Sequence, residues 1–272
     1  MPQLSTAGLK VYYEDHGKGE PLILMAGFGQ DPSAWSEQLD LFSRFFRVVL
    51  IDIRGGGRSE VPKSKFTPRD LATDVTALMD HLRLPRAHFG GFSLGGAAGM
   101  ELAAAHPERL SSLSLHSTWE ASEPYPHFNQ WVEIRQRIIA QNDPVVNVGT
   151  RLVSFFSPEF VNQRRDRIDL FVERAKSNPH PISAGGIEAQ AHACFSHDVR
   201  PRLDRIRTPT LVTVGTRDRT TLPAMSEYIH RHIAGSEFIV INGAAHFTVF
   251  EAPHEFASIS LGFLMKHMGR AA

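Results

Sequence analysis

Short apolar runs alternate with amphipathic segments along the first part of the chain. Residues 22–26 are continuously apolar, and residues 47–57 contain a second apolar run and end in three glycines. Such runs are typical of strands that are buried on both faces of a sheet. Residues 67–84 instead repeat leucine and valine at helical spacing, with Thr67 as the N-cap and Pro68 in the first turn. Strand and helix in this order predict a doubly wound, mostly parallel α/β sheet.

The alternation stops after residue 117 and resumes at residue 208. The segment 118–207 contains helix-like stretches and no clear strand, so we expect a helical cap inserted into a core made of residues 1–117 and 208–272. One apolar helix face within this segment is predicted from four residues: Phe128, Trp131, Ile134 and Ile138.

A serine flanked by glycines stands where a predicted strand joins a predicted helix. Residues 86–91 favour a strand, and residues 93–107 favour a helix. Gly91 and Gly95 give the form G-x-S-x-G around Ser93. A serine hydroxyl is a poor nucleophile unless a base removes its proton, and a sharp turn exposes the hydroxyl to such a base. The glycines relieve the crowding at the turn, so Ser93 is the predicted nucleophile.

Two residues late in the chain supply the base and the acid that an activated serine needs. His246 lies in a loop of small residues just beyond the apolar run 237–243. Asp218 lies three residues beyond Gly215, at the end of another apolar run. Because the loops after parallel strands share one edge of a sheet, both side chains are expected near Ser93. His246 is the predicted base, and Asp218 is the predicted acid that orients it.

Acyl transfer also needs two N–H donors for the oxyanion that forms. One donor is expected from Leu94, the residue after the nucleophile. The other is expected from Phe28, in the loop after the apolar run 22–26, where Gly27 and Gly29 allow the amide to turn inward. Phe28 and Leu94 are therefore the predicted oxyanion hole.

Composition narrows the choice of partners. The 272 residues carry 29 Lys and Arg against 29 Asp and Glu, so no net field attracts nucleic acid or an anionic membrane. No stretch approaches the roughly 18 apolar residues of a membrane span, and the start of the chain lacks the form of a signal peptide. The single cysteine, Cys194, excludes an internal disulfide and fits a reducing compartment, so we expect a cytoplasmic protein.

Taken together, these motifs resemble the α/β-hydrolase superfamily, in the serine-nucleophile branch with a helical cap. The resemblance extends over most of the chain in six blocks: residues 12–29, 48–59, 70–96, 103–115, 209–218 and 243–256. It implies a catalytic triad of Ser93, Asp218 and His246 and an oxyanion hole at Phe28 and Leu94. It also implies that the protein uses no metal and no organic cofactor.

Two positions near the predicted site depart from the usual pattern of the superfamily. Ala26 precedes Gly27 where the family usually has His-Gly, and Gly56 stands where the family usually has the histidine of R-G-H-G-x-S. Both changes remove polar groups near the site. They leave the class of substrate open.

The acid of the predicted triad has more than one candidate. Pro223 follows Asp218 by five residues, whereas the family proline commonly follows the acid by four. In some relatives the acid follows an earlier strand, which here is residues 110–117. Glu120 and Glu123 therefore remain alternative acids, although the block that ends at Asp218 matches the family better.

Three other interpretations are weaker. A dinucleotide fingerprint would need its third glycine at Pro32, and an aspartate-nucleophile hydrolase would need an aspartate at Ser93. His192, Cys194 and His197 resemble a metal-binding spacing. On a helix, however, His192 and Cys194 point to different faces, so we interpret them as structural.

The expected function is hydrolysis of a small carboxylic ester or lactone through an acyl-enzyme intermediate on Ser93. C–C bond hydrolysis and cofactor-free haloperoxidase or perhydrolase chemistry use the same triad and remain alternatives. A receptor of hydrolase fold that binds a small molecule without turnover is the non-enzymatic alternative. Cap aromatics, with Trp119 and Trp131 foremost, are expected to line the substrate pocket. The substrate's identity and the oligomeric state are left open.

Overall fold

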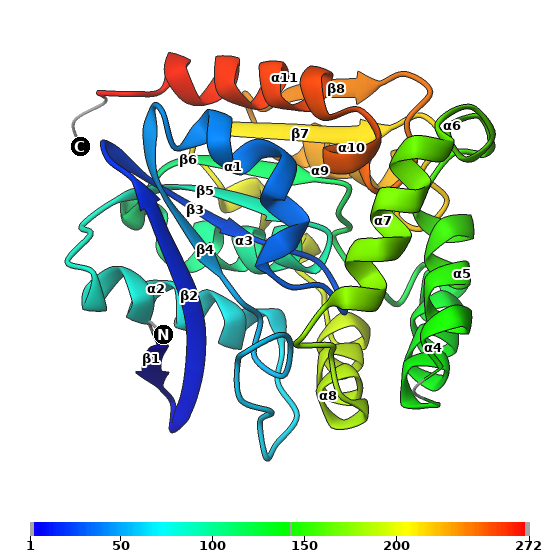
Figure 1. Cartoon of the computed structure of the whole chain (residues 1–272). Coiled ribbons are helices and arrows are strands. Elements are labelled where there is room, and N and C mark those ends of the chain that lie inside the picture. Colours follow the sequence, from blue (N-terminus) through cyan, green and yellow to red (C-terminus); the bar gives the residue numbers. More distant parts are fainter. Residues whose placement is uncertain (1–2, 142, 270–272) are drawn as a thin grey trace.

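A computed structural model describes residues 3–141 and 143–269, so the ends of the predicted core lie outside the described residues. Within these residues the strands form one eight-stranded sheet in the order β1-β2-β4-β3-β5-β6-β7-β8 (Figure 1). The strands are β1 (Gln3–Thr6), β2 (Leu9–Gly17), β3 (Glu20–Met25), β4 (Phe46–Ile51), β5 (Ala87–Phe92), β6 (Leu110–His116), β7 (Thr210–Gly215) and β8 (Glu237–Ile241). The β1–β2 and β2–β4 pairs are antiparallel, and the other neighbours are parallel. The predicted α/β sheet is confirmed.

Helices cover both faces of this sheet (Figure 1). The helices are α1 (Ser36–Phe42), α2 (Pro68–His81), α3 (Leu94–Ala105), α4 (Pro126–Ala140), α5 (Pro144–Phe155), α6 (Pro158–Gln163), α7 (Arg165–Ser177), α8 (Ala184–Phe195), α9 (Pro223–His232), α10 (Thr248–Glu251) and α11 (Pro253–Lys266), with 3₁₀ turns η1 (Pro32–Trp35), η2 (Pro107–Arg109) and η3 (Arg200–Arg205). Helices α2, α3 and α9 pack on one face, and α1 and α11 pack on the other. This arrangement is the doubly wound one that the sequence predicts.

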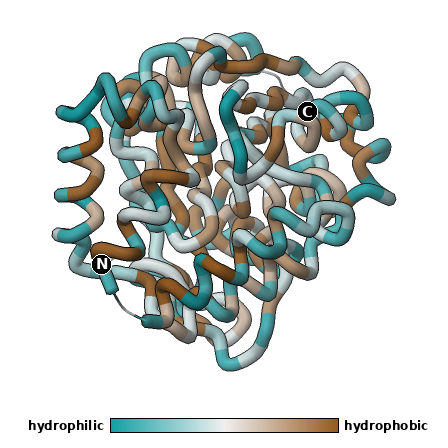
Figure 2. The backbone as a smooth tube through the Cα atoms, turned by 90° about the vertical axis from the view of Figure 1, so that its right-hand side faces the viewer, coloured by the Kyte–Doolittle hydropathy of each residue, from teal (hydrophilic) through white to brown (hydrophobic). Residues whose placement is uncertain are grey.

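The central strands are apolar because both of their faces are covered. In β3, Ile23 and Met25 pack into the core on the α2 and α3 side, whereas Leu22 and Leu24 pack into the core on the α1 and α11 side. All four side chains are at most 2% exposed. Hydrophobic stretches accordingly concentrate in the interior of the backbone trace, and hydrophilic ones lie at its periphery (Figure 2). Burial of this kind is the main source of the fold's stability.

The segment between β6 and β7, which we call the cap segment (residues 118–207), contains helices α4 to α8. They lie together beyond the carboxyl ends of the parallel strands (Figure 1). Helix α5 has no counterpart among the helices predicted from sequence, because its first turns are rich in valine, a poor helix former. Residues 158–177 form two helices, α6 and α7, with a break at Arg164.

The prediction of the apolar face of α4 is wrong, because most of the predicted positions precede the buried ones by one residue. Ile134 is 54% exposed, so it does not belong to the buried face. The side chains that α4 buries are Phe128, Val132, Arg135 and Ile139. An arginine on the buried face hides the true periodicity, because sequence reasoning places charged side chains in solvent. The burial of Arg135 is taken up below.

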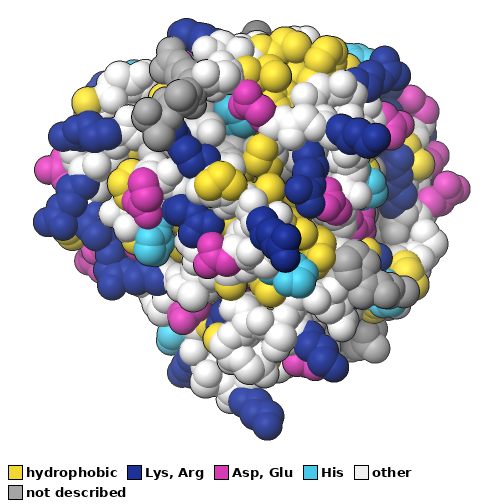
Figure 3. All heavy atoms as spheres, turned by 90° about the vertical axis from the view of Figure 1, so that its left-hand side faces the viewer, with side chains coloured by type: hydrophobic (Ala, Val, Ile, Leu, Met, Phe, Trp, Pro, Cys, Tyr) yellow, Lys and Arg dark blue, Asp and Glu magenta, His cyan; other side chains and the backbone are white. Residues whose placement is uncertain are grey.

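The surface shows no concentration of one charge on the side opposite the cap segment. There, basic and acidic side chains are intermixed (Figure 3), in line with the equal numbers of both in the sequence. Across the described ranges, none of the helices combines the length and the apolar character that a membrane crossing requires.

Candidate active site

Ser93 occupies a strained turn between β5 and α3. Its backbone φ is +54°, in a region that non-glycine residues rarely adopt, and such strain costs roughly 1–3 kcal/mol. A Cβ on Gly91 would lie 2.3 Å from the carbonyl oxygen of Gly95, and one on Gly95 would lie 2.4 Å from that of Met25. Both glycines are therefore required where the chain turns, as the G-x-S-x-G pattern predicts. Ser93 is 3% exposed.

Hydrogen bonds fix the backbone of this turn from both sides. The Ser93 N–H donates to the carbonyl of His116 at the end of β6, at 2.9 Å. The Thr118 hydroxyl donates to the Ser93 carbonyl at 2.8 Å. The strained conformation is thus held by the neighbouring strand and by the start of the cap segment.

His246 lies in the loop between β8 and α10 and is 1% exposed. Its Nδ1 lies 2.9 Å from Oδ2 of Asp218. An ionised carboxylate only accepts hydrogen bonds, so the proton of the neutral imidazole stays on Nδ1 and Nε2 is left as the basic nitrogen. The imidazole ring packs against Phe92, at 4.9 Å between ring centroids, and against Phe155, at 5.5 Å.

Asp218 lies in the turn after β7, and its carboxylate is saturated with hydrogen bonds. Oδ1 accepts from the backbone N–H groups of Thr220 and Thr221, both at 2.9 Å. Oδ2 accepts from the Thr221 hydroxyl at 2.9 Å in addition to His246. Four donors on a side chain that is 3% exposed hold the carboxylate in one orientation.

The two alternative acids are engaged elsewhere. Glu120 is buried and accepts a hydrogen bond from the hydroxyl of Tyr125 at 2.6 Å, and its burial raises the pKa of its carboxyl. Glu123 lies 3.6 Å from Arg200 at the surface. The carboxylate that contacts His246 is therefore that of Asp218.

The two predicted oxyanion donors lie at the start of α3 and in the loop after β3. Leu94 is the first residue of α3, where a backbone N–H has no acceptor within the helix. Phe28 lies between Gly27 and Gly29, and Gly29 has a φ of +69°, which glycine adopts without strain. A Cβ on Gly27 would lie 3.0 Å from the Cβ of Ser93, so this loop runs directly beside the predicted nucleophile.

Gln190 of α8 is a site residue that sequence reasoning missed. Its Oε1 accepts from the Gly29 N–H at 2.9 Å, so a cap helix holds the loop of Phe28. Its Nε2 would lie 2.8 Å from a Cβ on Gly56, the position at which the family usually carries histidine. Gln190 thus fills the space that the missing histidine side chain leaves. A lone glutamine in an alanine-rich helix gives no signal of this role.

Glu251 was also missed, and it connects the cap segment to the loop of His246. Its Oε2 accepts from the Ala245 N–H at 2.8 Å, and its Oε1 accepts from the backbone N–H and the hydroxyl of Ser157. A backbone hydrogen bond from Phe247 to Phe155, 2.9 Å long, lies beside this bridge. The position of His246 therefore depends on the cap segment.

The two tryptophans predicted for the pocket occupy different places. Trp131 of α4 lies between the predicted oxyanion loop and the histidine, 6.0 Å from the Phe28 ring and 6.4 Å from the His246 ring. Trp119 is fully buried against Phe128, and its indole N–H donates to Ser122. Trp131 is the better placed of the two to meet a substrate, and the role of Trp119 in a pocket remains a prediction.

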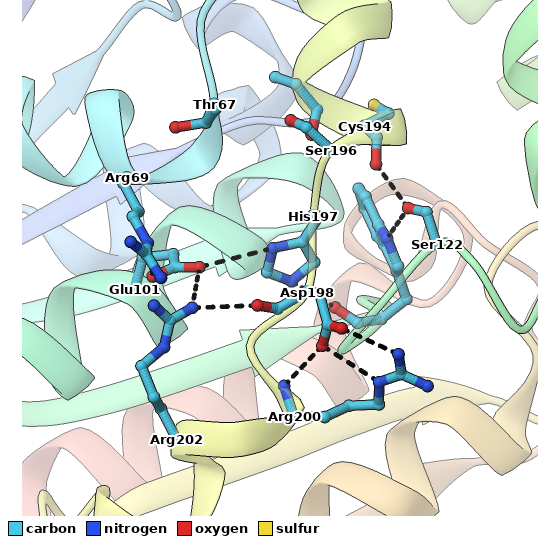
Figure 4. Close-up of polar contacts among 12 residues, drawn as sticks. Thr67, Arg69, Glu101, Ser122, Cys194, Ser196, His197, Asp198, Arg200 and Arg202 are labelled. Carbon is cyan, nitrogen blue, oxygen red and sulfur yellow. Dashed lines mark hydrogen bonds and ion pairs between the residues drawn. The ribbon is translucent and has the colours of Figure 1, made fainter.

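A group of charged residues fixes the end of the cap segment to α3, the helix that begins after Ser93 (Figure 4). Glu101 of α3 lies 2.7 Å from Arg202 and 3.3 Å from Arg69. His197 is buried beside the same carboxylate, 3.9 Å away, with Nε2 3.2 Å from the carbonyl of Trp119. Burial lowers the pKa of His197 to about 4, so the imidazole is neutral.

The residues with metal-like spacing serve the cap structure. His192 lies 3.0 Å from the carbonyl of Phe66 through Nδ1. Cys194 is fully buried, and burial raises the pKa of its thiol. With His197 placed against Trp119 and Glu101, the three side chains have separate surroundings.

Comparisons with known proteins agree with the observed fold. A family described as the alpha/beta hydrolase fold matches residues 20–253. A 3-oxoadipate enol-lactonase of Acinetobacter baylyi is 30% identical over 258 residues, which cover 93% of this chain and 92% of the relative.

Two further proteins are similar to this chain over nearly their whole length. The crystal structure of an enol-lactonase from Burkholderia xenovorans LB400 is 28% identical, with a TM-score of 0.85, and the alignment covers 97% of this chain and 100% of that one. A protein of Azorhizobium caulinodans named for a proposed carbamate hydrolase activity is 27% identical, over 97% of this chain and 98% of its own. From the match over most of its length, the chain belongs to the alpha/beta-hydrolase fold family.

Proposed function

We propose that the protein is a serine hydrolase that cleaves a small carboxylic ester or lactone through an acyl-enzyme intermediate on Ser93. The observation that carries the proposal is the hydrogen bond from His246 to Asp218, in a buried site beside the strained turn of Ser93. The similarity to two enol-lactonases supports a cyclic ester as the substrate.

In the first half-reaction, the Ser93 hydroxyl attacks the carbonyl carbon of the substrate while Nε2 of His246 accepts its proton. Asp218 holds the imidazole and stabilises the positive charge that forms on it. The carbonyl oxygen becomes an oxyanion, which the N–H groups of Phe28 and Leu94 receive. Each such donor typically contributes about 10²- to 10³-fold in rate.

Collapse of the tetrahedral intermediate breaks the ester bond and leaves the acyl group on Ser93. The leaving oxygen takes the proton from Nε2 of His246. In a lactone this oxygen stays attached to the acyl chain. In the second half-reaction, water gives a proton to His246 and attacks the acyl carbon, and the acid product leaves as Ser93 recovers its proton.

The cap segment controls access to this chemistry. Phe155 and Trp131 both lie against the His246 ring, so the base faces an apolar wall. An apolar wall limits water around the reacting groups and strengthens the electrostatic interactions within the site. Trp131 also lies beside Phe28, which places it to contact the group on the acyl side of the substrate.

A hydrolysis panel tests the proposal. It contains nitrophenyl esters of graded chain length, several lactones, aryl carbamates, a C–C bond substrate and a peracid-forming assay, each measured with wild type and Ser93→Ala. Repeated turnover of an ester or lactone, lost in Ser93→Ala, is the expected result. Faster turnover of a carbamate or of the C–C substrate would replace the proposed substrate class. Binding with no more than a few turnovers on every substrate would indicate a receptor instead.

A further inference from the structure

A cavity of about 370 Å³ lies between the cap segment and the loop that follows β3. Gly29, next to Phe28, and Phe247, next to His246, both line it. The cavity therefore lies next to the predicted oxyanion loop and the predicted base. Its far wall is formed by α5 and α7, where Arg151 and Phe171 line it.

Arg151 is a cation on this wall with unused hydrogen-bonding capacity. Its Nε is buried and has no hydrogen-bond acceptor in the part of the chain that the structure describes. Its guanidinium lies 5.2 Å from the centre of the Phe171 ring. In folded proteins nearly every buried polar group has a hydrogen-bond partner. The Nε atoms of Arg86, Arg135 and Arg202 also have none among the described residues, and Arg151 differs from these three because it lines the cavity.

A second arginine comes to this region from the neighbouring helix α4. Arg135 is 2% exposed, and its Nη1 donates to the side chain of Asn147 and to the hydroxyl of Thr150, both at 2.8 Å. These acceptors are neutral, and Asn147 itself lines the cavity. No carboxylate lies within ion-pair distance of Arg135 or Arg151 among residues 3–141 and 143–269, whereas the exposed Arg137 of α4 pairs with Glu133.

The acidic groups on the cavity wall are already engaged. Asp31 accepts from the Ser33 N–H at 2.8 Å and from the Asn178 amide at 2.6 Å. Asp143 accepts from the first N–H groups of α5 as its N-cap. These donors hold both carboxylates, and neither lies within ion-pair distance of Arg151, although the charge of Asp31 favours the Arg151 cation.

The other cations on the wall differ from Arg151. Arg174 of α7 pairs with Glu37 at 2.8 Å. Lys176 lines the cavity from the end of the same helix and is exposed to solvent. Among the described cations of this wall, Arg151 on α5 is therefore the one whose buried Nε lacks a hydrogen-bond acceptor.

The surroundings of the two arginines disfavour their charged forms. Burial, and to a smaller extent the charge of Arg151, lowers the pKa of Arg135 to about 9. Burial also lowers the pKa of Arg151, against a smaller opposing effect of Asp31. A buried cation is favourable only when it is paired and hydrogen-bonded. An anion bound in the cavity would provide both.

We propose that Arg151, supported by Arg135, binds a carboxylate carried by the substrate, so that the ester or lactone hydrolysed at Ser93 is itself an acid. This inference rests on the proposed function. A guanidinium matches the two oxygens of a carboxylate. A doubly charged phosphate fits less well, because Asp31 and Asp143 lie in the same wall and would repel it more strongly.

The spacing of Arg151 and Phe155 along α5 indicates how far this carboxylate lies from His246. Arg151 precedes Phe155 by one helical turn, about 5.4 Å, on the same face of the helix. The ring of Phe155 lies 5.5 Å from the ring of His246. The cavity is lined by the sequence neighbours of Phe28 and His246 and not by Ser93 itself, so a chain of several atoms separates the carboxylate from the reacting carbonyl.

A matched pair of substrates tests the inference. Mono-(4-nitrophenyl) glutarate and 4-nitrophenyl pentanoate have acyl chains of the same length, and only the first ends in a carboxylate. The ratio of their kcat/KM values is measured for wild type, Arg151→Met, Arg151→Lys and Arg174→Met. Arg174→Met is the control, since it removes a cation from the same cavity that is already paired with Glu37.

The wild type should prefer the glutarate ester, and Arg151→Met should lower the ratio about 10- to 100-fold, the range of a hydrogen bond to a charged group. Arg151→Lys should give an intermediate ratio, and Arg174→Met should stay within about threefold of wild type. A wild type without preference for the acid, or an Arg151→Met variant that keeps the wild-type ratio, would overturn the inference. If Arg151→Met does not fold, the Arg151→Lys ratio decides in the same way.

Thermal unfolding with glutarate, pentanoate or inorganic phosphate separates this inference from the proposed function. Glutarate should raise the Tm of wild type more than pentanoate or phosphate does, and should not raise that of Arg151→Met. This result would hold even if no ester were turned over, in which case the proposed function alone would fail. An equal effect of glutarate on both proteins, or a larger effect of phosphate, would contradict a carboxylate subsite at Arg151.

Discussion

Replacing Asp218 by asparagine should leave His246 in place but with its proton on the wrong nitrogen. Oδ1 of Asp218 accepts two backbone N–H groups, from Thr220 and Thr221. In the Asp218→Asn variant the amide oxygen must take this position, because an NH₂ group there would face two donors. The NH₂ group then points at Nδ1 of His246, which becomes an acceptor and shifts the imidazole proton to Nε2.

An imidazole with its proton on Nε2 cannot accept the proton of Ser93. In addition, the imidazolium that forms during the reaction loses the carboxylate that stabilises it. These effects together predict a fall in kcat of about 10²- to 10⁴-fold, or roughly 2.7–5.5 kcal/mol in activation free energy. Steady-state hydrolysis of the best nitrophenyl ester measures the fall, and the Tm of the variant reports whether the fold is intact.

Glu120→Gln and Glu123→Gln are the matched controls, since each removes one carboxylate from the alternative position of the acid. Both variants should stay within a few fold of the wild-type kcat. If the Asp218→Asn variant kept a kcat close to that of the wild type, Asp218 would not be the acid that orients His246. A large loss of kcat in a folded Glu120→Gln variant would instead identify Glu120, which follows β6, as the acid of the triad.

Three further outcomes follow from the structure. Glu251→Gln places an NH₂ group against the N–H of Ala245 or the donors of Ser157. The loop of His246 should then shift, and kcat should fall about tenfold or more with little change in KM. An unchanged kcat would show that the position of His246 does not depend on the cap segment. Burial raises the pKa of Asp52 to about 8 from an ordinary 3.8, so the folded protein keeps a proton that the unfolded chain releases. The free energy of unfolding therefore falls as the pH rises between these two pKa values. When Tm is measured from about pH 5 to about pH 8, the Tm of the wild type should fall relative to that of Asp52→Asn. Two parallel plots of Tm against pH would contradict this. Trp131→Ala should shift the preference toward longer acyl chains by about tenfold, and an unaltered chain-length profile would show that this ring does not contact the substrate.

Those parts of the site that depend on local geometry could be predicted from the sequence. The turn at Ser93 needs glycine at positions 91 and 95 because backbone atoms occupy the Cβ positions there, and this need is visible as a pattern. Asp218 and His246 could be placed near each other because both follow strands of one parallel sheet. Their contact follows from topology, which the strand pattern already indicates.

The parts that depend on the cap segment could not be predicted. Gln190 and Glu251 act through contacts between distant segments, and nothing in their local sequence indicates those contacts. The inward position of Arg135 also misled the assignment of the α4 face, because hydrophobic periodicity treats a buried arginine as a surface residue. Contacts between distant segments and buried charges break the local pattern, so they cannot be predicted from it.

Labelling with a fluorophosphonate probe shows directly whether Ser93 is an activated nucleophile, because such probes react with a serine only when a base activates it. Intact mass and peptide mapping of the labelled protein identify the residue, with Ser93→Ala as the control. The expected result is one label per chain, located on Ser93, with labelling strongly slowed in Asp218→Asn. A label on another serine, or a folded wild-type protein that takes up no label, would contradict it.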